Sequence, residues 1–413
     1  MSHGANRRHA LAPRNSLIDK PVGIYAGAGA SHSWTWLVDC LEAQGVPRLR
    51  LLSEEDPAAG ALDGLSALLI GGGDPQAMAA GMGPGGARAL RRFVEDGGLY
   101  VGFCAGAYLP IPLDLPVMDP FAMTGLRLAN VVDELPPARA LPTKLATPYE
   151  DRFVLHAARE GLLVRCAPSD LGWPDTLEAP LYGGAPMIVG PEEEPLAYFA
   201  DFTARTLFLV DEGLAAEILL DRVAVCRRRV GRGELYLFAP HLENPHYRTG
   251  HPLLARLLED KAPRVDRRHG LAASRTRAAV AQVARAGTDE IERVRRHASD
   301  ARIVAFALEF EDLHWRLGEK YYEPAKIVAL LDTLWKRLGR GCVSLSAGHA
   351  KELGDDLDEV LCLLKSIRRG VGEGLDTQPA AERLFPLLGR AVRRFVDAYL
   401  DDRGGRMVGA SAA

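Results

Sequence analysis

The 413-residue chain has six cysteines, and no two of them are close enough to form a Cys-x-x-Cys pair. Small disulfide scaffolds and zinc-knuckle domains both need closely spaced cysteines, so neither class fits this sequence. Scattered single cysteines are typical of a reducing compartment, and we therefore expect the protein in the cytoplasm. The six positions are Cys40, Cys104, Cys166, Cys226, Cys342 and Cys362.

The sequence also lacks a long apolar run and a marked excess of charge. No apolar segment approaches the roughly 18 residues that a membrane-spanning helix needs. The formal net charge is −4, which gives no electrostatic reason to expect a nucleic-acid or membrane partner. Residues 1–19 are polar and contain arginines without an apolar core, so we expect a disordered tail rather than a signal peptide.

What is present is the composition of an ordinary globular protein, with 47% hydrophobic and 25% charged residues. Strand and helix patterns alternate from residue 22 to residue 103, which predicts an α/β fold with a mostly parallel sheet and helices on both faces. Shorter strand patterns follow, and we expect antiparallel additions over residues 131–230. Beyond about residue 261, helical patterns take over. The sequence thus predicts an α/β domain over 20–260 and an α-helical accessory domain over 265–403. The four helical patterns cover residues 288–318, 324–338, 350–369 and 381–400.

The segment from Gly98 to Tyr108 is the most informative part of the chain. Leu99–Phe103 reads as a buried strand, and Cys104 follows at once among small residues. Small neighbours permit a sharp strand-to-helix turn that points its central side chain out of the sheet. Hydrolases present a nucleophile on such a turn, and the helix dipole lowers the pKa of a cysteine there. We interpret Cys104 as a nucleophile; the alternative is an inert buried cysteine.

A second apolar strand, Gly233–Phe238, is followed by His241 and Glu243. A cysteine nucleophile needs a base to take its proton, and the base needs a third group that orients its ring. The two residues supply both types of group where open α/β sheets place their chemistry, at the carboxyl end of a strand. The pair could also be solvated loop residues. His241 and Glu243 indicate a catalytic site only in combination with Cys104.

A third strand, Ala67–Ile70, runs into three consecutive glycines. Acyl transfer through a thioester generates an oxyanion, which two backbone N–H groups commonly stabilise. We expect one donor at Ala105 and the other at Gly72 or Gly73. An ordinary glycine-rich turn is the alternative interpretation of this segment.

With these motifs, residues of about 20 to 260 resemble the amidotransferase-like domain at the N-terminus of eukaryotic biotin-protein ligases. That domain belongs to the class I glutamine amidotransferase-like superfamily, which orders Cys, His and Glu along the chain as here. The last motif departs from the usual pattern, because Leu242 stands where proline is common. No part of the chain resembles the catalytic region of a biotin ligase. The matching pieces are residues 24–29, 70–74, 102–108, 182–184 and 240–243.

The resemblance implies a flavodoxin-like fold and cysteine-dependent hydrolysis of an amide, with glutamine-type side-chain amides first among small-molecule substrates. Cys104 would attack the carbonyl, His241 would move the proton and Glu243 would orient His241. The alternative is a non-catalytic regulatory or ligand-binding module that keeps the fold. We expect five residues to line the substrate pocket: Gly27, His32, Asp74, Tyr108 and Tyr182.

Other patterns are weaker. A dinucleotide loop would need a third glycine after Gly27 and Gly29, but that position holds His32, so we expect no cofactor. Glu311-x-x-His314 has the spacing of a carboxylate-bridged metal bundle, yet it occurs once, and we expect no metal. A zinc site at His241, Glu243, His246 and His251 would leave Cys104 unexplained. Arginines of the helical region could bind an anionic or protein partner, although they more often form a solvated face.

Overall fold

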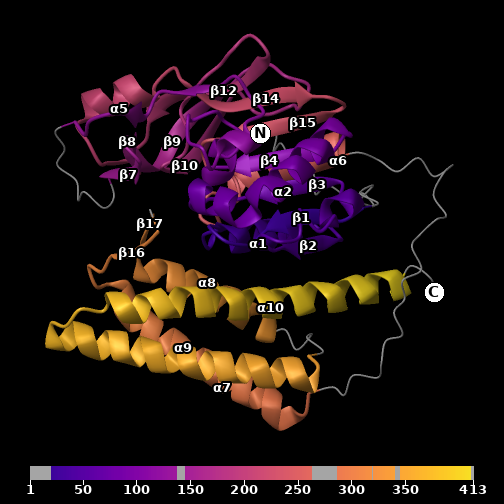
Figure 1. Ribbon diagram of the computed structural model, residues 1–413, viewed down its shortest axis with the longest axis vertical. Helices are drawn as coiled ribbons and strands as arrows, with labels where there is room; N and C mark the ends of the chain where they lie inside the picture. Colours follow the sequence, from indigo (N-terminus) through magenta and orange to yellow (C-terminus); the bar gives the residue numbers. More distant parts are fainter. Residues whose placement is uncertain (1–19, 137–144, 263–285, 319, 340–344, 411–413) are drawn as a thin grey trace, which may run out of the picture.

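The computed structural model describes residues 20–136, 145–262, 286–318, 320–339 and 345–410. The expected tail over residues 1–19 lies outside the described residues, as does Cys342. The chain forms two parts, an α/β part built on one large sheet and a stack of helices beside it (Figure 1).

Five parallel strands form the centre of the large sheet. Their order across the sheet is β2-β1-β3-β4-β15, and each neighbouring pair is parallel. This is the flavodoxin-like order, in which β1 and β3 flank the point where the strand order reverses. The predicted fold class is therefore confirmed. The bounds are β1 (Val22–Tyr25), β2 (Leu49–Leu52), β3 (Ala67–Ile70), β4 (Leu99–Phe103) and β15 (Gly233–Phe238).

Alternating side chains of these strands enter two separate cores, as a period of two requires. On one face Ile24 and Leu69 pack with helices α1 (Ser33–Ala43) and α6 (His251–Lys261). On the other face Tyr25 and Leu68 pack with α2 (Pro75–Glu95). The sheet is thus covered on both sides, which leaves the carboxyl ends of its strands as the accessible edge for a site.

The predicted antiparallel additions extend the sheet beyond β15. Strands β14, β12, β9 and β10 follow in that order, and every neighbouring pair among them is antiparallel. Their bounds are β9 (Ala158–Cys166), β10 (Thr176–Tyr182), β12 (Glu193–Phe202) and β14 (Val223–Val230). Short strands β11 (Met187–Ile188), β5 (Arg127–Leu128) and β13 (Leu207–Phe208) pair with this section, and helix α5 (Glu212–Leu219) lies beside it. Strands β6 (Val131–Val132), β7 (Ala146–Tyr149) and β8 (Arg152–Leu155) form a small separate sheet.

The helical part has two layers. Helices α8 (Pro324–Leu338) and α10 (Gln378–Ala410) lie next to the α/β part, and α7 (Thr288–Glu309) and α9 (Ala347–Glu373) lie beyond them (Figure 1). Buried leucines and valines of the helices belong to the same apolar cluster as α1 and one face of the sheet. The boundary expected near residue 261 coincides with the end of α6, and whether residues 20–260 fold alone stays a prediction.

One predicted helix ends earlier than expected. The helical pattern over residues 288–318 stops at Glu309, and the chain turns into a hairpin of β16 (Trp315–Leu317) and β17 (Lys320–Tyr322). Gly318 lies between the strands with φ +62°, a conformation that glycine adopts at little cost. Trp315 is buried and donates its indole N–H to Thr377 over 2.9 Å. This anchored hairpin, rather than another helical turn, connects α7 to α8. The sequence pattern also predicts a helix over residues 87–95, and these residues lie in the part of α2 that follows Gly83, where φ of 58° and ψ of −176° interrupt the helix that begins at Pro75.

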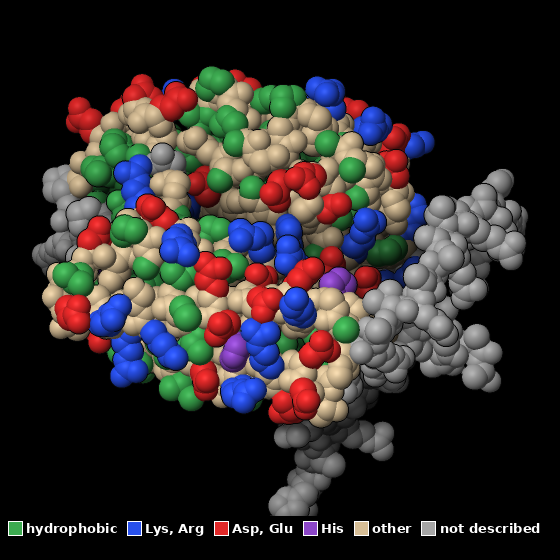
Figure 2. Space-filling view, turned by 60° about the horizontal axis from the view of Figure 1, so that its bottom comes forward, with side chains coloured by type: hydrophobic (Ala, Val, Ile, Leu, Met, Phe, Trp, Pro, Cys, Tyr) green, Lys and Arg blue, Asp and Glu red, His purple; other side chains and the backbone are tan. Residues whose placement is uncertain are grey.

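Charged pairs join the two parts. Arg337 of α8 contacts Asp39 and Glu42 of α1 at 2.8 and 2.5 Å. Arg393 of α10 lies 3.8 Å from Glu54. The face that includes the junction carries basic and acidic side chains interspersed, with a hollow between the two parts (Figure 2). The helices are therefore docked on the α/β part through both apolar and ionic contacts.

Candidate active site

The loops that follow β1, β3, β4 and β15 meet at the carboxyl edge of the parallel strands. The Cys104 N–H donates to the carbonyl of Phe238 over 2.9 Å, which ties the end of β4 to the end of β15. The Gly106 N–H donates to the carbonyl of Gly71 over 3.0 Å, which ties the turn after β4 to the glycines after β3. The three segments that the sequence singled out therefore lie together.

Cys104 occupies a strained turn between β4 and the short helix α3 (Ala105–Tyr108). Its φ of 49° and ψ of −110° fall outside the regions that residues with a Cβ favour. The turn closes tightly, because a Cβ on Gly106 would lie 2.1 Å from the carbonyl oxygen of Ile70. Strain of this kind is retained where the surrounding structure imposes it, and functional sites are frequent examples. The sharp strand-to-helix turn predicted from the small residues is present.

His241 lies between Cys104 and Glu243. Its Nδ1 is 2.7 Å from Glu243 Oε1, and its ring is close enough to the Cys104 thiol to lower the pKa of that thiol. The thiol also lies 3.8 Å from the carbonyl oxygen of Tyr182. His241 is 3% exposed and Glu243 is fully buried, so water screens these contacts little.

The electrostatics favour an ionised pair of sulfur and ring. Burial alone would raise the pKa of the Cys104 thiol, but the hydrogen bond and charge of His241, with Lys320 and the Ala105 N–H, hold that pKa below its ordinary value. Burial likewise opposes a charge on His241, yet Glu243 and Cys104 together raise the His241 pKa to about 10. The arrangement can therefore hold a thiolate beside an imidazolium at neutral pH.

Two of the predicted oxyanion donors, Ala105 and Gly72, lie beside Cys104 and His241, and their role toward an oxyanion stays a prediction. The Ala105 N–H is directed at the Cys104 sulfur and stabilises its negative charge. Gly72 lies against the His241 ring, since a Cβ there would be 2.9 Å from Cε1. Gly73 has φ +154°, and its Cβ would be 2.1 Å from the carbonyl oxygen of Gly29. Gly72 therefore excludes a side chain because of the His241 ring, whereas Gly73 excludes one because of the loop after β1.

Three predicted pocket residues make contacts that hold the structure together. The Tyr108 hydroxyl donates to the carbonyl of Gly183 and accepts from Asn130. Asp74 begins helix α2 by accepting the N–H groups of Gln76 and Ala77. Their roles toward a substrate stay predictions.

Tyr182, the third of them, lies against His241 and Cys104. Its ring packs against His241 at 5.6 Å, and its hydroxyl donates to Glu160 over 3.0 Å. Tyr182 thus covers one side of the His241 ring while its carbonyl oxygen contacts the thiol.

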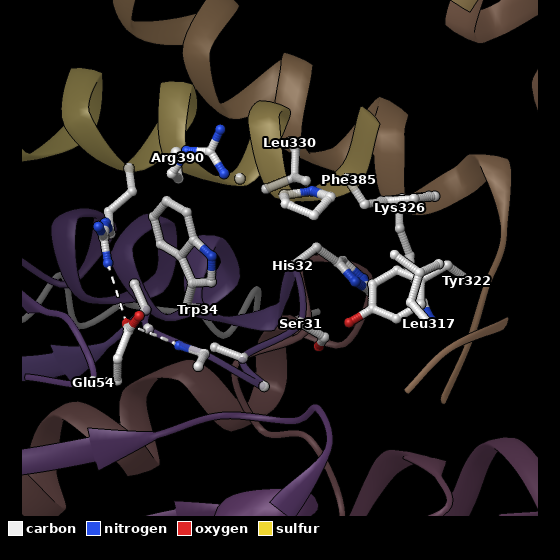
Figure 3. A pocket seen from close by; sticks show the side chains of 18 residues that line it. Ser31, His32, Trp34, Glu54, Leu317, Tyr322, Lys326, Leu330, Phe385 and Arg390 are labelled. Carbon is white, nitrogen blue, oxygen red and sulfur yellow. Dashed lines mark hydrogen bonds and ion pairs between the residues drawn. The ribbon is translucent and has the colours of Figure 1, made fainter. Parts of the chain in front are cut away.

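The other two predicted pocket residues, Gly27 and His32, line a cavity of about 350 Å³ (Figure 3). The loop from Gly27 to His32 forms one wall, and residues of the hairpin, α8 and α10 form the other. Gly27 permits this loop to approach Glu54, because a Cβ would lie 2.4 Å from the Glu54 nitrogen. Cys104 does not line this cavity; His32, which does, contacts Trp36, and Trp36 contacts His241.

Several residues at the site were not found from the sequence. Trp36 packs edge-on against both His32 and His241, with ring centres 4.6 and 6.0 Å away. It lies in the helix predicted after the first strand, and its aromatic character was the only available signal. Lys320 and Lys326 come from the helical part and carry no motif, so only the folded chain brings them near Cys104.

The metal alternatives are not assembled in the part of the chain that the structure describes, where no three His, Cys, Asp or Glu side chains come together as ligands. His251 instead contacts the carbonyl oxygen of Asn244 at 3.0 Å. His314 lies near Asp312 and Glu323, at 3.6 and 3.7 Å. Among the described helices, none is long and apolar enough to cross a membrane.

Cys104 is expected to react with iodoacetamide at pH 6 to 7 faster than the exposed Cys362 does. Its pKa is held below the ordinary value, whereas burial raises that of Cys40, Cys166 and Cys226. Lowering the pH from 8 to 6 should slow the alkylation of Cys104 little, because the His241 charge that stabilises the thiolate persists until the pH approaches 10. Mass spectrometry of the alkylated peptides measures the rates, and a Cys104 rate that falls about tenfold for each pH unit below 8 would contradict a stabilised thiolate.

Comparisons with known proteins give structural likenesses only: no known protein family and no curated protein matches the chain in sequence. A solved protein from Thermoplasma acidophilum, described as part of a GMP synthase, is 13% identical, with 57% of this chain and 92% of that chain covered and a TM-score of 0.36. A glutamine amidotransferase is 17% identical, with 57% and 98% covered and a TM-score of 0.35. A β-galactosidase from Bacillus circulans is 14% identical, with 60% and 32% covered and a TM-score of 0.37.

Proposed function

We propose that this protein is a cysteine-dependent amide hydrolase of the glutamine amidotransferase-like class, with Cys104 as nucleophile, His241 as acid and base, and Glu243 as orienting group. One observation carries the proposal: a buried histidine joins a strained-turn cysteine to a buried carboxylate, with 2.7 Å between His241 Nδ1 and Glu243 Oε1. Nucleophile, base and orienting group in mutual hydrogen-bond reach is the arrangement that thiol catalysis needs.

The chemistry follows from the protonation states. The Cys104 thiolate attacks the amide carbonyl, a C–S bond forms, and negative charge moves to the carbonyl oxygen. The Ala105 N–H, with that of Gly72 or Gly73, would stabilise this oxyanion. Because Glu243 holds Nδ1, the other nitrogen of His241 faces the reaction and gives its proton to the leaving amine. Water, deprotonated by His241, then hydrolyses the thioester and releases Cys104.

The substrate class proposed first is a small-molecule amide of the glutamine type. The resemblance to the N-terminal domain of biotin-protein ligases is part of the same proposal. This resemblance implies no reaction other than amide hydrolysis. A regulatory module that keeps the fold remains the competing hypothesis, and it predicts an intact pocket without turnover. The two hypotheses differ in whether Cys104 attacks a glutamine-like electrophile.

A diazoketone analogue of glutamine, 6-diazo-5-oxo-L-norleucine, tests this directly. The expected result is a covalent adduct on Cys104 alone, mapped by mass spectrometry and prevented by excess L-glutamine. Cys166→Ser is the matched control and should be labelled like the wild type, while Cys104→Ser should not be labelled. If the analogue labels no cysteine although iodoacetamide alkylates Cys104, a glutamine-type substrate is wrong. Equal labelling of several cysteines would contradict the nucleophile itself.

A further inference from the structure

The cavity between the two parts has the size and walls of a small-molecule site. Its volume of about 350 Å³ is within the range that such ligands occupy. The apolar walls come from both parts, with Trp34 on the α/β side and Leu330 and Phe385 on the helical side (Figure 3). A ligand with an apolar body could therefore lie between α1 on one side and α8 and α10 on the other.

The charge of the cavity is positive. Its lining has three cationic side chains, Lys326, Arg390 and Arg393, against one carboxylate, Glu54. Glu54 already accepts the Ala28 N–H at 3.1 Å and lies 3.8 Å from Arg393. The remaining positive charge would complement an anionic group on a ligand.

Of the three cationic side chains that line the cavity, Lys326 is one on which the Cys104 charge acts. Its Nζ donates to the carbonyl of Tyr321 over 2.5 Å and lies 4.2 Å from the centre of the Tyr322 ring. Burial, opposed by Glu323, lowers the pKa of Lys326 to about 7, and the Cys104 charge also acts on it. The amine is thus poorly solvated, and an anion beside it would replace the water contacts that it has lost.

His32 gives an independent sign of a missing ligand. Its Nδ1 is buried and has no hydrogen-bond partner among the described residues. Burial, with Lys326 and His241 nearby, lowers the His32 pKa to about 3, so the ring is neutral and offers one donor and one acceptor. An unpaired buried ring nitrogen costs free energy unless a ligand or water satisfies it. His32 lines the cavity and also contacts Trp36, which contacts His241.

We propose that the cavity binds the distal end of the amide substrate and that this end carries a carboxylate on an apolar chain, recognised by Lys326 with His32 beside its path to Cys104. The inference rests on the proposed function and names its substrate class. The proposal also assigns a role in substrate recognition to the helical part. Helix α8 supplies Lys326, and the hairpin that precedes α8 supplies Lys320 near the thiolate. The helices would then select the substrate, while the sheet supplies the nucleophile.

Iodoacetyl amides with different tails test the proposal without knowledge of the natural substrate. In each reagent the Cys104 thiolate attacks the methylene carbon, a C–S bond forms and iodide leaves. One series has glycine, 4-aminobutyrate or 6-aminohexanoate as the amine, so that a carboxylate ends a tail of increasing length. The matched series has ethyl, butyl or hexyl amines and is neutral. The measured quantity is the ratio of carboxylate-tail to neutral-tail labelling rates at Cys104 within one protein.

In the wild type the carboxylate reagent of the best length should label Cys104 about tenfold faster than its neutral partner, as expected for one charge-assisted contact. Lys326→Met should bring the ratio close to one, and Lys326→Arg should keep most of it. Lys365→Met, an exposed lysine of α9, is the matched control and should behave like the wild type. Cys362 in the same sample should show no preference for the carboxylate.

Each outcome is decisive. A ratio near one at every tail length would overturn the anionic substrate while leaving the nucleophile intact, because plain iodoacetamide reports that separately. A raised ratio that survives Lys326→Met would move recognition to another residue and contradict the assignment. Failure of every reagent to label Cys104 would overturn the proposed function as well. Circular dichroism of each variant confirms that it is folded before the rates are compared.

Discussion

Replacing His241 by alanine is expected to lower glutamine hydrolysis by roughly a thousandfold or more, because it removes the proton acceptor and the charge that stabilises the thiolate. Both effects act on Cys104, whose pKa is held below its ordinary value mainly by this ring. Cys104→Ser should cost about as much, and the double variant should lose little more, since residues that act as a unit give non-additive losses. Ammonia release from L-glutamine measures all three rates.

Glu243→Gln should retain more activity than either variant. The amide oxygen can still accept from His241 Nδ1, so the ring keeps its orientation, but the carboxylate charge that raises the His241 pKa is lost. The optimum of the pH–rate profile should therefore move to lower pH in Glu243→Gln. Cys226→Ser, a buried cysteine of the sheet core, serves as the control and should keep wild-type rates. Turnover by His241→Ala at the wild-type rate would exclude His241 from catalysis.

The sequence predicted the sheet and its edge well because the evidence was local. Leu99–Phe103 and Gly233–Phe238 are mostly apolar runs; Cys104 directly follows the first, and His241 follows the second after Ala239 and Pro240. Parallel strands bring their carboxyl ends to one edge, so three separate motifs could be placed together without knowledge of the loops. The sharp turn at Cys104, with φ 49°, could be predicted in the same way, since its small neighbours permit the close approach that such a turn needs.

The rest of the site depends on contacts between distant segments. Lys326 lies more than two hundred residues after Cys104 in the sequence. In a helix with one apolar face, its charge has the same pattern as a solvated lysine. The hairpin after Glu309 was missed because the polar pattern over residues 310–314 continues a helical period, whereas the anchoring of Trp315 by Thr377 is a tertiary contact. Periodicity describes one segment at a time and cannot show which segment covers which site.

Arg337 illustrates the same difficulty and leads to the largest expected effect on stability. Its side chain is 1% exposed, and its guanidinium contacts Asp39 at 2.8 Å, Glu42 at 2.5 Å and the carbonyl of Thr333 at 3.0 Å. Removing one partner of a buried ion cluster leaves the other charges poorly solvated, which typically costs about 3 to 5 kcal/mol. Arg337→Met should lower the free energy of unfolding by about that amount.

The expected loss arises at the junction, because Arg337 belongs to α8 while Asp39 and Glu42 belong to α1. Urea denaturation followed by circular dichroism measures the free energy of unfolding.

Arg383→Met is the matched control. Arg383 pairs with Glu359 at 2.9 Å, but both side chains are at least half exposed, at 68% and 50%, so this substitution should cost less than about 1 kcal/mol of stability. Adding Asp39→Asn and Glu42→Gln to Arg337→Met should recover part of the loss, because the two carboxylates that lost Arg337 are then neutral, and their other partners, Lys336 and Arg403, are exposed enough to be solvated. Equal destabilisation by Arg337→Met and Arg383→Met would show that the buried cluster does not hold the helices on the sheet domain. A large loss confined to Arg337→Met would mean that the helical part, and with it Lys326, is fixed beside Cys104 by a contact that only the folded chain creates.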